Sequence, residues 1–161
     1  MPKKNIIEIH NLGELKLLAK KINKLLKKFN FPIFLNGEIG AGKTTFAKIL
    51  IKLLNPKIVN VGSPTFNIAN TYEYNNNNII INIWHFDLYR IIDENELAIF
   101  DMPDILNNQI AIIEWANKFS SLIDYNPNTL IIEIIVKNKI REFNFYCKNE
   151  MILNNLKEKN R

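Results

Sequence analysis

One glycine-rich stretch combines residue types that bind phosphate. Residues 35–45 read Leu-Asn-Gly-Glu-Ile-Gly-Ala-Gly-Lys-Thr-Thr, and Gly37, Gly42, Lys43 and Thr44 fit the pattern G-x-x-x-x-G-K-[ST] without a mismatch. This pattern is typical of the phosphate-binding loop (P-loop) of proteins that bind nucleoside triphosphates. The sequence therefore predicts a triphosphate site here.

Each residue type in the loop has its own part in phosphate binding. The glycines permit positive φ angles and let backbone N–H groups face an anion, and the helix that follows adds the positive end of its dipole. Lys43 can reach the β- and γ-phosphates, the Thr44 hydroxyl is the expected ligand of Mg²⁺, and Thr45 is expected to add a hydroxyl contact. The predicted nucleotide-binding residues of the loop are Gly37, Glu38, Ile39, Gly40, Ala41, Gly42, Lys43, Thr44 and Thr45.

The segments on either side of the loop supply the strand and the helix that it needs. Residues 31–35 are a short apolar run that predicts a buried strand, and residues 44–54 have apolar side chains at helical spacing. A chance match in a glycine-rich turn that caps a helix is the alternative. The order of strand, loop and helix argues against it.

Two acidic side chains end other predicted strands. Asp87 follows the apolar run 79–86, and Glu114 lies at the end of the run 109–115. The carboxyl ends of strands are where α/β folds bind ligands, so Asp87 suits a Mg²⁺ carboxylate that acts directly or through water. Glu114 suits a second carboxylate beside the metal or a group that orients the attacking water. As isolated residues, they could instead be a helix N-cap and an exposed strand-end charge.

Other polar residues near these strands are open to two interpretations. Thr65 lies in the turn-rich segment 61–66 and could follow the metal and the γ-phosphate as a nucleotide-sensing switch. Ser63 and Thr65 could equally be plain turn formers. His85 is predicted to be a satisfied core or hairpin residue rather than a metal ligand, because His10 is the only other histidine and no cysteine lies nearby.

The remaining pattern predicts strands and helices of an α/β fold. The expected elements are an edge strand at 6–9, an amphipathic helix capped by Asn11 and ending near Phe29, a hairpin of 67–74 and 79–86, a short helix at 93–100 interrupted by 101–104, a hairpin of 129–136 and 141–147 with Cys147 in the core, and a final helix from 150 that frays into a charged tail ending at 161. We expect a three-layer, P-loop NTPase-like single domain over residues 1–161, with a mainly parallel sheet extended by antiparallel hairpins.

Composition limits the possible classes of protein. The 161 residues are 47% hydrophobic and 23% charged, which fits one globular domain. A single cysteine excludes an internal disulfide framework and a multi-cysteine zinc site. No signal peptide or membrane-spanning run is visible, so we expect a soluble cytoplasmic protein. The net charge of +5 permits an acidic partner such as RNA, although a lysine excess is more often a solvated surface.

A P-loop alone does not decide what is done with the nucleotide. A GTPase of the Ras kind would carry D-x-x-G and N-K-x-D, but residues 87–90 lack the glycine and residues 117–120 lack the aspartate. A small-molecule kinase usually clamps its phosphoryl group with several arginines, and this chain has only Arg90, Arg141 and Arg161.

The combination of motifs resembles the TsaE (YjeE) family. The motifs are Gly37-Glu-Ile-Gly-Ala-Gly-Lys-Thr-Thr-Phe46, Ser63-Pro-Thr-Phe66, His85-Phe-Asp-Leu-Tyr-Arg90, Glu94-Asn-Glu-Leu97 and Ile113-Glu-Trp115, in this order. The resemblance implies an ATPase of tRNA threonylcarbamoyladenosine biosynthesis that acts with the TsaB and TsaD proteins, which make the modification. Any contact with tRNA is then expected through that complex.

The resemblance agrees with the roles suggested by residue type. ATP and Mg²⁺ are the expected ligands, Lys43, Asp87 and Glu114 the catalytic residues, and Thr44, Asp87 and Glu114 the metal ligands. Thr65 and Trp115 join the nucleotide-binding set, although Trp115 could simply be a core aromatic.

Two features depart from the family pattern. Ala116 follows the Glu-Trp pair where the family usually has proline, and no clear counterpart of the family's N-terminal Thr and Gly lies between Asn11 and Lys24.

A small-molecule P-loop kinase and an RNA-binding module with a vestigial loop are the remaining alternatives.

Overall fold

A seven-stranded sheet carries the glycine-rich loop at the end of its middle strand. The computed structural model describes residues 4–157, apart from the side chain of Asn76. The strands are β1 (Lys4–Ile9), β2 (Ile33–Gly37), β3 (Ala69–Asn76), β4 (Ile79–Asp87), β5 (Ile110–Glu114), β6 (Leu130–Lys137) and β7 (Ile140–Tyr146). Their order across the sheet is β1-β7-β6-β2-β5-β4-β3.

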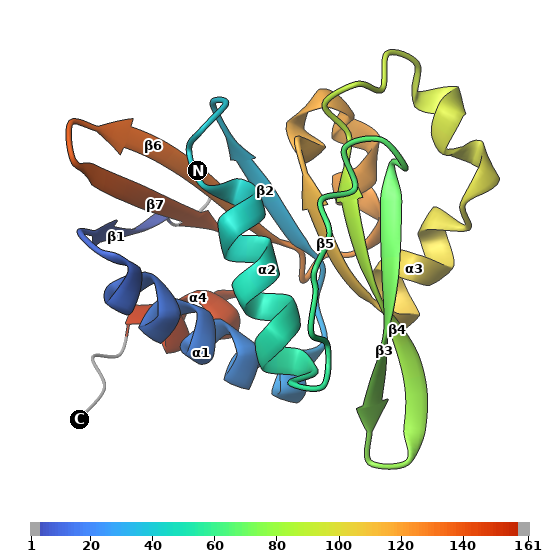
Figure 1. Cartoon of the computed structure of the whole chain (residues 1–161), viewed down its shortest axis with the longest axis horizontal. Helices are drawn as coiled ribbons and strands as arrows, with labels where there is room; N and C mark the ends of the chain where they lie inside the picture. The colour runs from blue at the N-terminus through green and yellow to red at the C-terminus, as the bar shows by residue number, and fades with distance from the viewer. Residues whose placement is uncertain (1–3, 158–161) are drawn as a thin grey trace.

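Helices cover both faces of this sheet (Figure 1). They are α1 (Leu12–Phe29), α2 (Lys43–Leu54), α3 (Met102–Asn108) and α4 (Glu150–Lys157), with 3₁₀ turns η1 (Glu94–Ile99), η2 (Ala116–Lys118) and η3 (Ser120–Tyr125). One core contains side chains of α1, α2 and α4, and the other contains those of α3 and the 3₁₀ turns. The expected three layers are therefore present. Within residues 4–157, no helix combines the length and apolar character that crossing a lipid bilayer requires.

Four neighbouring strands, β6, β2, β5 and β4, are parallel, and the strands on either side of them pair in antiparallel fashion. Strand β2 pairs in parallel with β5 and with β6, and β4 pairs in parallel with β5. The pairs β3–β4, β6–β7 and β1–β7 are antiparallel. This confirms the expected parallel sheet extended by hairpins, with the first strand at one edge.

Side-chain alternation divides the apolar residues between the two cores. On β2, Ile33 and Leu35 face the core under α1 and α2, while Phe34 lies in the core on the other face. On β5, Ile112 and Ile113 divide in the same way. Strand β5 is buried on both faces and reads as a continuous apolar run, whereas β4 is exposed at Ile79 and Ile80 and becomes buried only from Ile83 onward.

Helix α1 follows the predicted pattern. Asn11 caps it, because its side-chain oxygen accepts a hydrogen bond from the Glu14 backbone N–H at 2.9 Å. The apolar side chains at helical spacing are buried, and they are Leu15, Leu18, Ala19, Ile22, Leu25 and Leu26. The lysines on the outer faces, Lys16, Lys20, Lys24, Lys27 and Lys28, are exposed.

The prediction of the loop strand was wrong by two residues. Phe31 is buried but precedes the strand, which runs from Ile33 to Gly37. Pro32 has no N–H to give to a ladder, and only its carbonyl is used, as the acceptor for the Leu130 N–H. The helix after the loop, α2, begins at Lys43, one residue before the predicted start at Thr44.

The segment 101–104 starts a helix, whereas we expected an interruption. Asp101 caps α3 by accepting from the Asp104 backbone N–H, and Pro103 lies in the first turn, where its missing N–H costs nothing. The preceding segment is the 3₁₀ turn η1 rather than an α-helix. Asp93 and Glu96 form a capping box at its start.

Ile22 and Leu17 lie on the same helix in opposite environments, which allows a test of the packing. Ile22 is fully buried, and Ile22→Ala should lower the free energy of unfolding by about 2–5 kcal/mol through lost burial and a cavity. Leu17 is 56% exposed, and Leu17→Ala should change the free energy of unfolding by less than about 0.5 kcal/mol. Urea denaturation of both variants is the measurement. Equal losses would contradict the assigned face of α1.

Candidate functional site

The parallel register brings three strand ends together beside the glycine-rich loop. Asp87 at the end of β4 pairs with Glu114 at the end of β5, and Glu114 pairs with Leu35 on β2. The loop of residues 37–42 then leads into α2. Both predicted carboxylates therefore lie on the strands next to the loop, at the same edge of the sheet.

The loop has the backbone conformation that glycine permits. Gly37, Gly40 and Gly42 have φ angles of 145°, 80° and 108°. A Cβ atom on Gly37 would lie 2.5 Å from the Ile134 carbonyl oxygen, so no larger residue fits there without movement. Gly42 is the N-cap of α2 and offers no side-chain cap, which leaves the positive end of this helix facing the loop.

Lys43 holds its charge inside the loop. Only 5% of the residue is exposed, and its Nζ donates to the carbonyl oxygens of Gly37 at 2.7 Å and Glu38 at 2.8 Å. The Nζ also lies 4.0 Å from the ring centroid of Trp115, which has a positive φ of 61°. Burial lowers the pKa of Lys43, and the charges of Glu114 and Asp87 oppose this effect.

A chain of hydrogen bonds links the start of α2 to β5 and then to β4. The Thr44 hydroxyl donates to Oε2 of Glu114 at 2.7 Å. Oε1 of the same carboxylate lies 2.7 Å from Nε2 of His85. Glu114 is 2% exposed and His85 is fully buried. Both Glu114 oxygens are therefore in hydrogen-bond contact, and the Thr44 hydroxyl hydrogen points to Glu114.

Asp87 is more accessible and is joined to the turn-rich segment. Its Oδ2 accepts from the Thr65 hydroxyl at 3.4 Å, and Ser63 and Thr65 share a hydrogen bond of 2.6 Å. Its Oδ1 accepts from the Tyr89 backbone N–H at 3.0 Å. Ile68, which lies between this segment and β3, has a φ of 63°, a strained angle for a β-branched residue.

A cavity of about 330 Å³ lies between the loop and the two carboxylates. It is lined by Ile39, Gly40, Gly42, Lys43, Thr44, Thr45, Asp87, Tyr89, Glu114 and Trp115. Most of the residues that the sequence suggested for nucleotide and metal binding thus surround one space. Thr65 reaches it only through Asp87, while Gly37 and Glu38 contribute their carbonyls to Lys43.

A second cavity, of about 260 Å³, lies beside the same loop. It is lined by Ile9, His10, Asn11, Leu12, Leu15, Gly40, Ala41, Gly42, Thr45, Arg141 and Phe143. The segment between β1 and α1 therefore contacts the loop region, although the sequence predicted no nucleotide contact from it.

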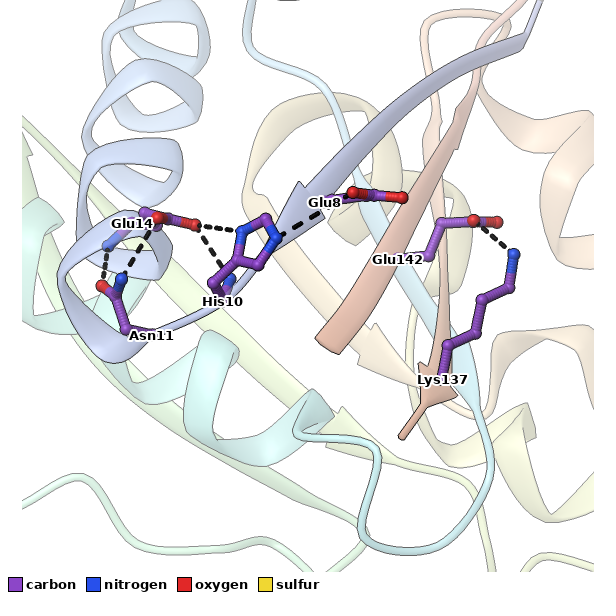
Figure 2. Close-up of polar contacts among 6 residues, drawn as sticks. All are labelled: Glu8, His10, Asn11, Glu14, Lys137 and Glu142. Atoms are coloured by element: carbon purple, nitrogen blue, oxygen red, sulfur yellow. Dashed lines mark hydrogen bonds and ion pairs between the residues drawn. The ribbon is translucent and has the colours of Figure 1, made fainter. Parts of the chain in front are cut away.

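Polar contacts hold this segment in place, as Figure 2 shows. The Glu14 carboxylate accepts from the backbone N–H of His10 at 2.8 Å and from the Asn11 side chain, and it lies 3.1 Å from Nδ1 of His10. The hydrogen bond from the His10 N–H, followed by the one from its ring, lowers the pKa of Glu14. Glu8 approaches the other side of the same ring.

Sequence reasoning missed three residues of this region as site residues. Arg141 donates from Nε to the Ala41 carbonyl at 3.1 Å, Tyr89 lines the first cavity with its ring 5.0 Å from that of Trp115, and His85 binds Glu114. Arg141 is far from the loop in sequence, and only the β1–β7 register places it beside Ile9. For His85, its position two residues before Asp87 on a strand was the available signal.

The donor set of the first cavity fits a triphosphate with Mg²⁺. Within the described residues, no group of three or more His, Cys, Asp or Glu side chains forms a metal cage. Mg²⁺ is usually held by one or two carboxylates together with phosphate oxygens and water, so the Thr44 hydroxyl and two nearby carboxylates suffice. The glycine loop and Lys43 match the phosphates.

Comparison with known proteins gives consistent results. Residues 9–143 match the family model described as Threonylcarbamoyl adenosine biosynthesis protein TsaE. Curated relatives named tRNA threonylcarbamoyladenosine biosynthesis protein TsaE include those of Rickettsia felis, 34% identical over 81% of this chain and 74% of the relative, and Aquifex aeolicus, 37% identical over 77% and 84%. The crystal structure of Bacillus subtilis YdiB is similar with a TM-score of 0.67 and 26% identity over 97% of this chain and 95% of that one.

The close approach of Gly37 to Ile134 predicts unequal effects of alanine in the loop. Gly37→Ala combines an unfavourable φ with a clash and should lower the free energy of unfolding by about 2 kcal/mol or more. Gly40 has open space around its Cβ position, so Gly40→Ala should cost only about 1 kcal/mol for its φ. Urea denaturation measures both. A greater loss for Gly40→Ala would contradict the observed loop conformation.

The lowered pKa of Lys43 predicts a pH dependence of stability. Between this lowered pKa and the ordinary value of 10.5, the unfolded chain binds more protons than the folded chain, so folding becomes more favourable as the pH rises. The stability of the protein relative to Lys43→Met should therefore increase as the pH rises through this window toward 10.5. Urea denaturation at several pH values measures this difference.

Lys52 on the same helix is exposed and supplies the control. The stability difference between the protein and Lys52→Met should stay flat over the same pH range. A flat or falling difference for Lys43→Met would contradict the burial of the Lys43 ammonium group.

Proposed function

The chain belongs to the TsaE family, and we propose that it binds and slowly hydrolyses ATP with Mg²⁺ in support of tRNA threonylcarbamoyladenosine modification at the adenosine next to the anticodon. The observation that carries the proposal is the Thr44–Glu114 hydrogen bond at the start of α2, beside the buried Lys43. It places a P-loop hydroxyl beside a strand-end carboxylate, the two kinds of group with which P-loop NTPases hold Mg²⁺.

The phosphates would lie in the first cavity. Backbone N–H groups of the loop and the N-terminus of α2 supply donors for their oxygens. Lys43 would exchange its two carbonyl partners, those of Gly37 and Glu38, for phosphate oxygens, which are stronger acceptors for an ammonium group. The second cavity adjoins the loop and offers apolar and polar walls from Leu12, Phe143 and Arg141 for the nucleoside.

Thr44, Asp87 and Glu114 would hold Mg²⁺, which when bound would neutralise charge on the phosphates. Thr44 donates its hydrogen to Glu114, so its oxygen lone pairs are free to face the cavity. Asp87, at the end of β4, lines the same cavity and accepts a hydrogen bond from the Thr65 hydroxyl at 3.4 Å.

The carboxylates have different parts in the proposed hydrolysis. Each Glu114 oxygen has one hydrogen-bond contact, with Thr44 or with His85, which suits Glu114 to orient Thr44 and to face the metal or its waters rather than to accept a proton from water. Asp87 is only partly buried and can orient the attacking water. Lys43 and the loop N–H groups stabilise the charge that develops on the transferred phosphoryl group.

The family also suggests the setting in which the ATPase works. We assign the whole chain to one ATPase domain in the cytoplasm, with TsaB and TsaD as the proteins to which ATP turnover is coupled. The turn-rich segment of Ser63 and Thr65 is joined to Asp87 by hydrogen bonds, and so can respond to the γ-phosphate. Any tRNA contact would come through that complex.

Removal of the charged groups tests the proposed chemistry. Lys43→Ala should lower ATP turnover by roughly a hundredfold or more, because the charge inside the loop is lost, and should weaken ATP binding. Asp87→Asn and Glu114→Gln should also lower turnover. The measurements are phosphate release and displacement of a fluorescent ATP analogue, with the exposed Lys52→Ala as a matched control. Turnover that survives Lys43→Ala would remove the loop from the mechanism.

The product and the partners separate this proposal from its rivals. Incubation with ATP and cell metabolites should yield free phosphate, whereas a phosphorylated metabolite would indicate a kinase. A pull-down from the cell extract should recover TsaB and TsaD in amounts that differ between ATP and ADP. Salt-sensitive tRNA binding by the isolated chain that ignores nucleotide would favour an RNA-binding module instead.

A further inference from the structure

We propose that His85 is a positioning residue that holds the Glu114 carboxylate in the orientation in which Glu114 binds the Thr44 hydroxyl. This inference rests on the proposed function, since Thr44 and Glu114 matter only if the loop binds nucleotide with a metal. It assigns a function to a histidine that residue type and spacing alone had assigned to the core.

Strand register places His85 beside the site but out of reach of the cavity. On β4, Ile83, His85 and Asp87 share one face, and Ile83 packs in the core under α1 and α2. His85 pairs with Ile112, two residues before Glu114, so its ring reaches Glu114 diagonally across the two strands. It is absent from the residues that line the first cavity.

Within the described part of the chain, the hydrogen bond of the His85 ring goes to Glu114. The Nε2–Oε1 distance is 2.7 Å, and in the tautomer with hydrogen on Nε2 the ring donates to the carboxylate. Its other nitrogen, Nδ1, is buried and has no partner among the described residues. A phenyl ring of similar size would fill this position without an unsatisfied Nδ1, but it would leave Oε1 of Glu114 without its His85 partner. The contact with Glu114 is therefore what the histidine adds.

Glu114 needs this contact because it has another attractive neighbour. Glu114 and Lys43 line the same cavity, and the charge of the carboxylate opposes the effect of burial, which lowers the pKa of the ammonium group. With one oxygen held by His85 and the other by Thr44, the plane of the carboxylate is fixed. Without His85, the carboxylate is free to turn toward Lys43, and Thr44 then loses the acceptor that keeps its lone pairs directed at the cavity.

Three substitutions separate positioning from packing. His85→Gln keeps an N–H donor at about the reach of Nε2, His85→Asn puts its N–H too close to the backbone to reach Glu114, and His85→Phe keeps the ring without a donor. The main readout is the binding of a fluorescent ATP analogue, measured with EDTA and across a Mg²⁺ titration. Phosphate release and the thermal midpoint are measured on the same samples.

The proposal predicts that His85→Phe and His85→Asn bind the analogue in EDTA within about twofold of the unchanged protein. Both should need roughly 10- to 100-fold more Mg²⁺ for half-maximal enhancement of binding, as expected when the partner of a metal-site residue is lost. His85→Gln should restore the Mg²⁺ requirement to within a few fold. If His85→Phe fails to fold, the Mg²⁺ requirements of His85→Gln and His85→Asn provide the same comparison.

Two results would overturn the positioning role. One is a Mg²⁺ requirement that stays unchanged in His85→Asn or His85→Phe. The other is a Mg²⁺ requirement that rises in His85→Gln as much as in the other two variants, which would indicate that the histidine acts by packing alone. Failure of the proposed function looks different, because the unchanged protein itself would then bind the analogue without any effect of Mg²⁺.

Discussion

The parallel pairing of β2, β5 and β4 is the constraint on which the site depends. Their register places Leu35, Glu114 and Asp87 in one row at the end of the sheet, next to the loop that follows β2. A shift of one residue would turn either carboxylate to the opposite face and into an apolar core. The buried residues behind this row, such as Ile33, Ile83 and Ile112, therefore fix the position of the chemistry as well as the fold.

Burial makes the interactions among the charged groups strong and costly to disrupt. Lys43 and Glu114 are nearly inaccessible, and hydrogen bonds to loop carbonyls, to Thr44 and to His85 satisfy them. Strained backbone accompanies them, since Trp115 takes a positive φ to lie over Lys43. Its N–H donates to the Leu35 carbonyl and Ala116 begins η2, so this turn is held although the proline usual in the family is missing.

The sequence alone predicted those features that depend on local pattern. The glycine loop, the Asn11 cap, the two hairpins and the strand-end carboxylates follow from residue type and spacing. The predicted boundaries near two prolines were wrong. Proline can either precede an element, as Pro32 precedes β2, or lie in its first turn, as Pro103 lies in α3. Arg141 and His85 were missed because their partners, Ala41 and Glu114, are brought to them only by strand order and register.

The central claim is that the glycine loop holds a triphosphate and its metal opposite the two strand-end carboxylates. A crystal structure with a non-hydrolysable ATP analogue and Mg²⁺ tests it most directly. Phosphate oxygens should lie within hydrogen-bond distance of the loop N–H groups and Lys43 Nζ, with Asp87 and Glu114 facing the metal or its bound waters. Phosphates bound outside the loop, or both carboxylates turned away from it, would contradict the account.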